Sequence, residues 1–287
     1  MSKDVKKNIV GKKQLEKGKI ITQILITLAA LLFVAPILMI INYSFKTKRE
    51  LYLDSPLALP KSINFDNYVA AFHKLDMATT FLNTLFYTVA SVAVLVILCG
   101  AAAWAISRRK GKFFKLSYIY ILIGILIPYQ ALFLPIYIIG FKSGLIDSRL
   151  GIILMYVATQ FSFGVFLMTS FMSTVPVELE ESAMIDGCSI YRTYFTIVLP
   201  LLKPAIATLT IMLSFQIWND YLMANLFLSS KKLKTLTVAM QALFSQQTSD
   251  YTTALAAIVI SVLPIAILFI SLQKYFIKGM TTGALKG

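Results

Sequence analysis

Six long runs of apolar residues constrain the fold of this chain more strongly than its other sequence features. They cover residues 20–43, 81–105, 116–140, 150–172, 204–223 and 253–275. A helix that crosses a bilayer needs about 20 mostly apolar residues, and each run reaches that length. Inside hydrocarbon every backbone N–H and C=O group needs an internal partner, which an α-helix supplies within one segment. We therefore predict an all-α, polytopic membrane helical bundle with six transmembrane helices.

The composition supports a membrane protein and argues against other classes. Only 14% of the 287 residues are charged, whereas a soluble domain usually has about a quarter. The net charge of +14 lies in short segments between the apolar runs and forms no basic face interleaved with aromatic residues, so nucleic-acid binding is not expected. The two cysteines and the single histidine have no metal-ligand spacing. We expect no catalytic residue, no metal and no cofactor.

The basic residues of the short segments predict the orientation of the bundle. Seven lysines precede the first run, and Arg108, Arg109 and three lysines follow the second. Segments rich in lysine and arginine stay in the cytoplasm. Six spans then give a cytoplasmic N-terminal tail over residues 1–19, a transmembrane domain over residues 20–276 and a cytoplasmic C-terminal tail over residues 277–287. The segments left outside are residues 46–80, 141–149 and about 224–251.

The cytoplasmic segment between the fourth and fifth runs differs from the other loops because it is acidic. Its acidic residues are Glu178, Glu180, Glu181 and Asp186, against Arg192 alone up to residue 200. Pro176 is tolerated in a first helical turn, Gly187 can end a helix in the left-handed conformation, and Ser189 suits the N-cap of a second helix. We predict two short helices that meet at a turn. They form either a plain amphipathic connector or an element that a partner protein binds.

Residues 181–200 resemble the "EAA" signature of the permease subunits of ABC importers. The matching positions are Glu181, Ala183, Asp186, Gly187 and Pro200, whereas Ser182 and Cys188 replace two alanines of the signature. Residues 218–222 and 234–238 are also similar to the second permease of carbohydrate importers of the maltose-system type. The resemblance implies a multi-pass protein of the cell membrane. Its expected partners are a second permease subunit, two copies of a cytosolic ATP-binding subunit and an extracellular solute-binding protein.

The resemblance also implies a function and a contact surface. The chain would form half of the transmembrane pathway for a sugar or oligosaccharide, and residues 173–203 would couple it to the ATPase. Carried over by position, the ATPase contact consists of Glu181, Ala183, Asp186 and Gly187. The chain has no P-loop, so ATP hydrolysis would belong to a separate protein. An importer permease for another solute and a secondary transporter driven by an ion gradient stay open as alternatives.

Polar and aromatic residues in or near the runs are candidates for the transport pathway, because amides can bind sugar hydroxyls and aromatic rings can stack on sugars. The candidates are Tyr129, Gln130, Gln160, Gln216, Trp218, Asn219 and Asp220. Hydrogen bonding between helices is the alternative role for the glutamines and for Asp220. Pro128 and Pro135 flank two of the candidates and indicate either a hinge or simple packing. The sequence leaves open whether the candidates face a common cavity.

Overall fold

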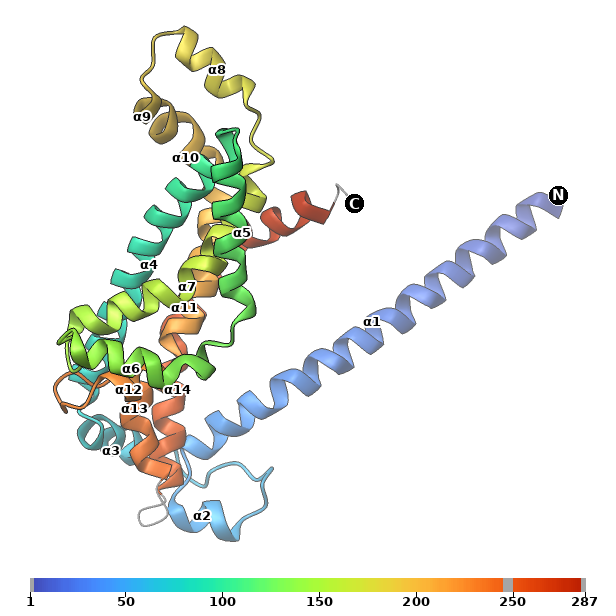
Figure 1. Ribbon diagram of the computed structural model, residues 1–287. Coiled ribbons are helices and arrows are strands. Elements are labelled where there is room, and N and C mark those ends of the chain that lie inside the picture. The colour runs from blue at the N-terminus through green and yellow to red at the C-terminus, as the bar shows by residue number, and fades with distance from the viewer. Residues whose placement is uncertain (1–2, 245–249, 285–287) are drawn as a thin grey trace. The chain divides into compact units, whose positions relative to one another are not determined.

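The computed structural model describes the backbone of residues 3–244 and 250–284 and the side chains of residues 18–244 and 250–275. All regular secondary structure in these described residues is helical, which confirms the all-α prediction (Figure 1). The chain divides into two compact units: Met1–Ala71 with Ser249–Val259 is unit 1, and Phe72–Thr248 with Ile260–Gly287 is unit 2. The expected C-terminal tail at 277–287 and the lysines up to Lys17 lie outside the described side chains.

Among the described residues, four helices are long and apolar enough to cross a membrane as single segments. They are α1 (Lys3–Ser44), α4 (Met77–Arg108), α7 (Arg149–Met172) and α14 (Tyr251–Ala284). Their qualifying portions are Gly18–Ser44, Met77–Arg108, Arg149–Met172 and Tyr251–Tyr275. These portions lie within a few residues of the first, second, fourth and sixth apolar runs.

The third apolar run, and the fifth run together with the residues before it, instead form helix pairs that bend sharply. In the third, α5 (Lys112–Leu126) gives way to η1 (Tyr129–Leu132) and α6 (Phe133–Lys142) at an angle of 88°. The break lies at Pro128, which lacks an N–H group and whose ring obstructs a continuing helix. Counting each bent pair as one span gives the six predicted spans.

The fifth span begins before the predicted run of residues 204–223, with several short helical pieces. They are α9 (Ile190–Thr193), the π-helix η2 (Tyr194–Val198) and α10 (Leu199–Leu201), which precede α11 (Lys203–Trp218) at a bend of 72°. Pro204 lies in the first turn of α11, where its missing N–H group leaves no helical bond unmade. The helix ends at Trp218, so residues 219–221 of the predicted span form a turn and residues 222–223 already belong to α12 (Leu222–Phe227).

The core of unit 2 is built by α4, α7 and α11, which pack against one another. Leu95 and Cys99 of α4, Val165 of α7 and Leu209 of α11 are fully buried in it. At Gly164 a Cβ atom would lie 2.5 Å from the Cys99 sulfur, so the glycine permits close approach of α7 to α4.

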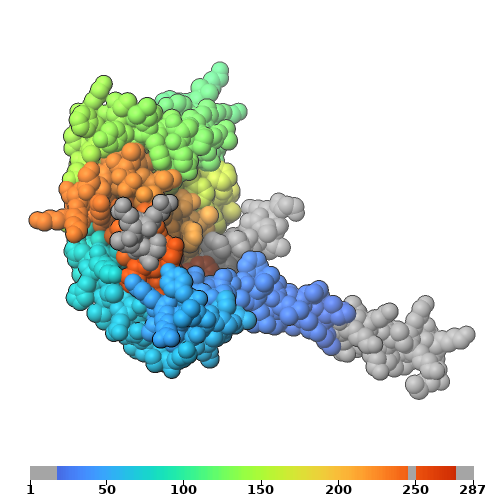
Figure 2. All heavy atoms as spheres, turned by 90° about the horizontal axis from the view of Figure 1, so that it is seen from below, coloured from blue at the N-terminus to red at the C-terminus, as the bar shows by residue number. Residues whose placement is uncertain are grey.

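The two ends of unit 2 carry different short helices. Figure 1 shows α8 (Glu178–Ile185) and α9 at one end, and α6, α12 and α13 (Leu236–Gln241) at the other. Figure 2 shows the atoms of α6 beside those of α12, which pack together. The loop before α13 is attached to α4, because Asn83 Nδ2 donates to Lys232 O at 2.8 Å and Tyr87 Oη donates to Leu233 O at 3.1 Å.

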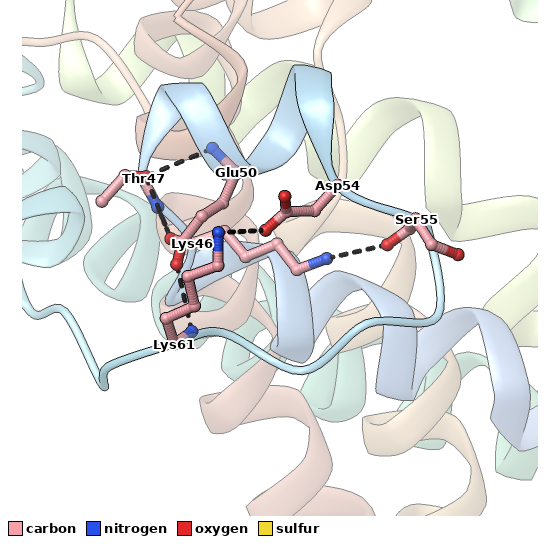
Figure 3. A network of polar contacts seen from close by, with 6 residues as sticks. All are labelled: Lys46, Thr47, Glu50, Asp54, Ser55 and Lys61. Atoms are coloured by element: carbon pink, nitrogen blue, oxygen red, sulfur yellow. Dashed lines mark hydrogen bonds and ion pairs between the residues drawn. The ribbon is translucent and has the colours of Figure 1, made fainter.

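In unit 1, the segment that follows α1 is shaped by the polar network of Figure 3. Lys46 is fully buried, and its Nζ donates to Ser55 O at 3.3 Å. Glu50, in α2 (Lys48–Leu53), forms a capping box with Thr47 and accepts the Lys61 N–H at 3.0 Å. Lys61 Nζ also pairs with the Asp54 carboxylate at 3.3 Å. Glu50, Asp54 and Lys61 of this predicted outer segment therefore have partners within it, whereas Lys48 pairs with Asp250 at 3.2 Å.

Candidate functional site

The segment between α7 and α11 folds into two short helices that meet at Gly187, which confirms the prediction from its sequence. α8 ends in a Schellman motif: the Cys188 N–H donates to Ala183 O at 2.9 Å and the Gly187 N–H to Met184 O at 3.1 Å. Gly187 has a φ of 82°, in the left-handed region that favours glycine. Ser189 Oγ then accepts the Arg192 N–H at 3.3 Å and caps α9.

The turn between α8 and α9 presents acidic and apolar side chains together on an open surface. Glu181, Asp186 and Gly187 are exposed, and a Cβ atom at Gly187 would meet no other atom within 4 Å. Two apolar neighbours are also exposed, Ile185 at 86% and Tyr191 at 74%. Such a combination is typical of a surface that another protein covers. We call residues 181–191 the α8–α9 tip.

Ala183 differs from the other three expected contact residues because it is buried. Its carbonyl oxygen accepts the Cys188 N–H that closes the Schellman motif. Ala183 therefore supports the turn from inside, and the exposed part of the expected ATPase contact consists of Glu181, Asp186 and Gly187.

Glu180 is the acidic residue of this segment whose environment the sequence did not reveal. Its side chain is buried, with 3% of the residue exposed. The carboxylate accepts from Arg108 Nε at 2.7 Å and from Trp104 Nε1 at 2.8 Å, both on α4. Arg108 Nη2 also donates to Val175 O at 2.8 Å. This buried ion pair ties α8 to the end of α4, although its two residues are 72 positions apart.

Trp104 also contacts the start of the fifth span. Its ring lies 4.9 Å from the ring of Tyr194, measured between centroids, with a tilt of 39°. Tyr194 is buried and is the first residue of the π-helix η2. Trp104 therefore joins α4 to α8 through its indole N–H and to η2 through its ring.

A cavity of about 790 Å³ lies elsewhere in unit 2, between the break in the third run, α7 and the end of α11. Five of the seven candidate pathway residues line it: Tyr129, Gln160, Gln216, Asn219 and Asp220. The remaining polar or aromatic lining comes from Tyr156, Thr159, Ser162, Phe163 and Tyr221. The structure therefore brings together residues that the sequence could only group by type.

Two candidates do not line this cavity. Gln130 is exposed, although it follows Tyr129 directly. Trp218 is buried, its Nε1 donates to Ser261 O at 3.0 Å, and its ring packs edge-on against Phe81. Trp218 therefore packs within unit 2 and does not present its ring to the cavity.

Asp220 both lines the cavity and holds its wall together. Its Oδ2 accepts from Tyr156 Oη on α7 at 2.9 Å and from the Ala224 N–H at 2.9 Å. Its Oδ1 accepts the Met223 N–H at 3.3 Å. The expected hydrogen bond to a neighbouring helix is confirmed, and the same carboxylate caps α12.

Among the described residues that line the cavity, none is a lysine, arginine or histidine. The polar groups are amides, hydroxyls and one carboxylate, and that carboxylate already accepts three hydrogen bonds from the protein. A mostly apolar and aromatic pocket with a few converging polar groups is typical of a small-molecule site.

The chain is similar to known membrane components of transport systems. Residues 97–282 match the family described as "Binding-protein-dependent transport system inner membrane component". The chain is 35% identical over 257 residues to "Probable starch degradation products transport system permease protein AmyC" of Thermoanaerobacterium thermosulfurigenes, which covers 90% of this chain and 93% of that protein. It is also 35% identical over 270 residues to "Melibiose/raffinose/stachyose import permease protein MelC" of Bacillus subtilis (strain 168), with 94% and 97% covered.

A solved structure has a similar fold. It is described as a bacterial ABC transporter involved in the import of the acidic polysaccharide alginate. The TM-score is 0.79 and the sequence identity 27%, over 91% of this chain and 97% of that one.

Proposed function

The chain belongs to the family of binding-protein-dependent transport system inner membrane components, and from this premise we propose that it forms half of the pathway of an ATP-driven sugar importer. The matched residues, 97–282, contain both the α8–α9 tip and the cavity. The family expected from the motif at residues 181–200 is confirmed, as is a multi-pass position in the cell membrane. The named relatives handle starch degradation products, melibiose, raffinose and stachyose, which supports a sugar as cargo.

The α8–α9 tip is the proposed contact with the ATPase. The observation that carries this proposal is the exposure of Glu181, Ile185, Asp186 and Tyr191 around the left-handed Gly187. Figure 1 shows this tip and α12, which contributes to the cavity wall, at opposite ends of unit 2. The basic residues after α4 favour a cytoplasmic position for the end that carries the tip.

The remaining proposed partners rest on the family and on the P-loop that this sequence lacks. The sequence has no P-loop, so a separate cytosolic chain, in two copies, would hydrolyse ATP. A second permease subunit would supply the other half of the pathway. A solute-binding protein would deliver the cargo at the outer loop of residues 224–251, of which residues 245–249 lie outside the described residues.

Substitution of Gly187 by proline tests the ATPase contact. Proline fixes φ near −65°, which is incompatible with the φ of 82° at this turn. We expect Gly187→Pro to abolish copurification of the ATPase from detergent extracts while the bundle stays folded. Gly144→Pro is the matched control, because Gly144 has a φ of 67° and its N–H also donates a turn bond of 3.1 Å.

Two outcomes would contradict the ATPase contact. One is retention of the ATPase by Gly187→Pro at the wild-type level, whereas equal loss from both glycine variants would only indicate general misfolding. The other is robust uptake by this chain alone in vesicles, driven by an ion gradient, which would favour a secondary transporter. Uptake of a non-sugar solute, with no sugar taken up across a panel, would instead favour the alternative importer class.

The cavity is the proposed contact with the cargo, and its glutamines provide the test. Removing one hydrogen bond to a neutral sugar costs about 1 kcal/mol, so Gln160→Ala and Gln216→Ala should each weaken apparent sugar affinity roughly two- to tenfold. Gln23→Ala is the control, since that exposed residue of α1 does not line the cavity. Equal uptake kinetics in all three variants would contradict a role of the cavity.

The cavity lining further favours neutral over acidic sugars. A carboxylate that leaves water needs a paired charge or several hydrogen bonds, and the described lining offers no cation. We expect the assembled transporter to take up neutral oligosaccharides and not uronate oligosaccharides, in contrast to the alginate importer of similar structure. Comparable uptake of both classes would contradict this expectation.

A further inference from the structure

We infer that Trp104, Arg108, Glu180 and Tyr194 form a joint that transmits movement of α8 to α4 and to the start of the fifth span. The inference rests on the proposed function, because the ATPase would supply the movement at the α8–α9 tip. We call these four residues the joint cluster. They are positioning residues, since none of them belongs to the exposed tip or to the cavity lining.

The first connection of the joint cluster is the ion pair between α8 and α4. The Arg108–Glu180 distance is 2.7 Å, and the two side chains are only 14% and 4% exposed. Separating a buried pair leaves each charge without compensation in a low-dielectric environment, which is strongly unfavourable. When α8 is displaced, Glu180 should therefore carry the end of α4 with it.

The second connection runs from α4 to the fifth span. The Tyr194 ring packs on Trp104, and Trp104 Nε1 donates to the same Glu180 carboxylate at 2.8 Å. Gly100 of α4 permits this approach, because a Cβ atom there would lie 2.7 Å from Tyr194 Oη. Tyr194 should therefore move when either α4 or α8 moves.

Tyr194 lies in the π-helix η2, which leads toward the cavity through α11. π-Helices are rare and are frequently found at functional sites. η2 is followed by the 72° bend into α11, and α11 ends at the cavity residues Asn219 and Asp220. A displacement at Tyr194 therefore acts on the helix that reaches the cavity wall.

The test uses the assembled transporter in proteoliposomes, with its ATPase, second permease and solute-binding protein. Glu180→Gln keeps the size of the side chain and removes its charge. We expect the ATPase to stay bound and to hydrolyse ATP, while sugar uptake per ATP falls roughly two- to thirtyfold, the range for substitutions that disturb coupling between sites. Arg108→Gln should have a similar effect.

Three further variants distinguish a joint from a purely structural role. Arg109→Gln removes the same charge from the next residue, which is exposed, and should leave uptake per ATP unchanged. The double variant Glu180→Gln with Arg108→Gln should lose no more coupling than either single variant, because both remove the same interaction. Trp104→Phe keeps an aromatic ring but removes the indole N–H, and it should give a smaller loss of uptake per ATP.

The result that supports the joint is low uptake per ATP in Glu180→Gln with the ATPase still bound. Loss of the bound ATPase from Glu180→Gln, with retention by the wild-type chain, would overturn the joint and make Glu180 a docking determinant. Wild-type uptake per ATP in Glu180→Gln would also overturn it. Failure of the wild-type chain to retain an ATPase would overturn the proposed function itself, so the two failures are distinguishable.

Discussion

The hairpin of α8 and α9 and the segment of residues 46–61 each contain one buried glutamate, yet the partners of the two carboxylates lie at very different distances along the sequence. In the second segment Glu50 accepts hydrogen bonds from Thr47 and from Lys61, at most 11 positions away. In the hairpin Glu180 accepts from residues 72 and 76 positions away. A local network can shape one loop, whereas a long-range buried pair joins separate helices and can pass movement between them.

The largest effect that follows from this comparison is loss of the long-range pair. Glu180→Ala leaves the mostly buried Arg108, whose side chain is 14% exposed, without its carboxylate partner, which should destabilise the fold by up to about 3 kcal/mol. We expect a clear fall in the thermal unfolding midpoint of the detergent-solubilised protein. Glu181→Ala is the matched control, because its exposed side chain should contribute within about 0.5 kcal/mol. Similar midpoints for both variants would contradict the assigned difference.

The same contrast explains which parts of the hairpin could be predicted. The left-handed turn at Gly187 and the cap at Ser189 depend on residues a few positions apart, so the sequence is sufficient for them. The break at Pro128 is local in the same sense. The burial of Glu180 could not be predicted, because it depends on the packing of α4 beside α8 and no local signal distinguishes Glu180 from Glu181.

The cavity shows a similar limit. Residue type and position near a helix end were sufficient to select Gln216, Asn219 and Asp220 as candidates, and all three line the cavity. They were insufficient for Gln130 and Trp218, because the direction in which a side chain points depends on the break after α5 and on the rotation of α11. Composition could identify candidate sugar-binding groups but not the cavity that they share.

Asp220 has both a long-range and a local hydrogen-bond partner, so its substitution should have an intermediate effect on stability. It accepts one bond from Tyr156, 64 positions away, and another from Ala224, four positions away. Asp220→Ala leaves the buried Tyr156 hydroxyl without its acceptor, so we expect a loss of about 1–3 kcal/mol, measured as a lower unfolding midpoint. Asn219→Ala should change the midpoint little, because its exposed amide donates only to Phe215 O of its own helix. A larger loss for Asn219→Ala would contradict this order.

The local network should respond to pH with a smaller effect. Hydrogen bonds from the Thr47 N–H, and then from the Lys61 N–H, hold the pKa of Glu50 below its usual range. The folded state therefore binds this proton more weakly than the unfolded state. The stabilisation is complete above the ordinary glutamate pKa of about 4.3 and is lost as the pH falls through the lower folded-state pKa.

Local hydrogen exchange of residues 47–61 measures this response. Exchange should accelerate in acid in the wild-type protein and should lose that pH dependence in Glu50→Gln, after correction for intrinsic exchange. An unchanged pH dependence in Glu50→Gln would assign the effect to another group. If hydrogen exchange near Glu180 and Arg108 accelerated in acid together with that of residues 47–61, the two networks would not be independent.

The smallest expected effect concerns the exposed ion pair of Lys61 and Asp54, whose side chains are 76% and 24% exposed. Lys61→Ala removes the ammonium group but keeps the backbone N–H that donates to Glu50. Exposed pairs contribute about 0–1 kcal/mol and are screened over about 10 Å at 0.1 M salt. The small loss on Lys61→Ala should therefore vanish in high salt, whereas the loss on Glu180→Ala should persist because its pair is buried. Equal salt sensitivity of the two losses would show that burial does not distinguish the two networks.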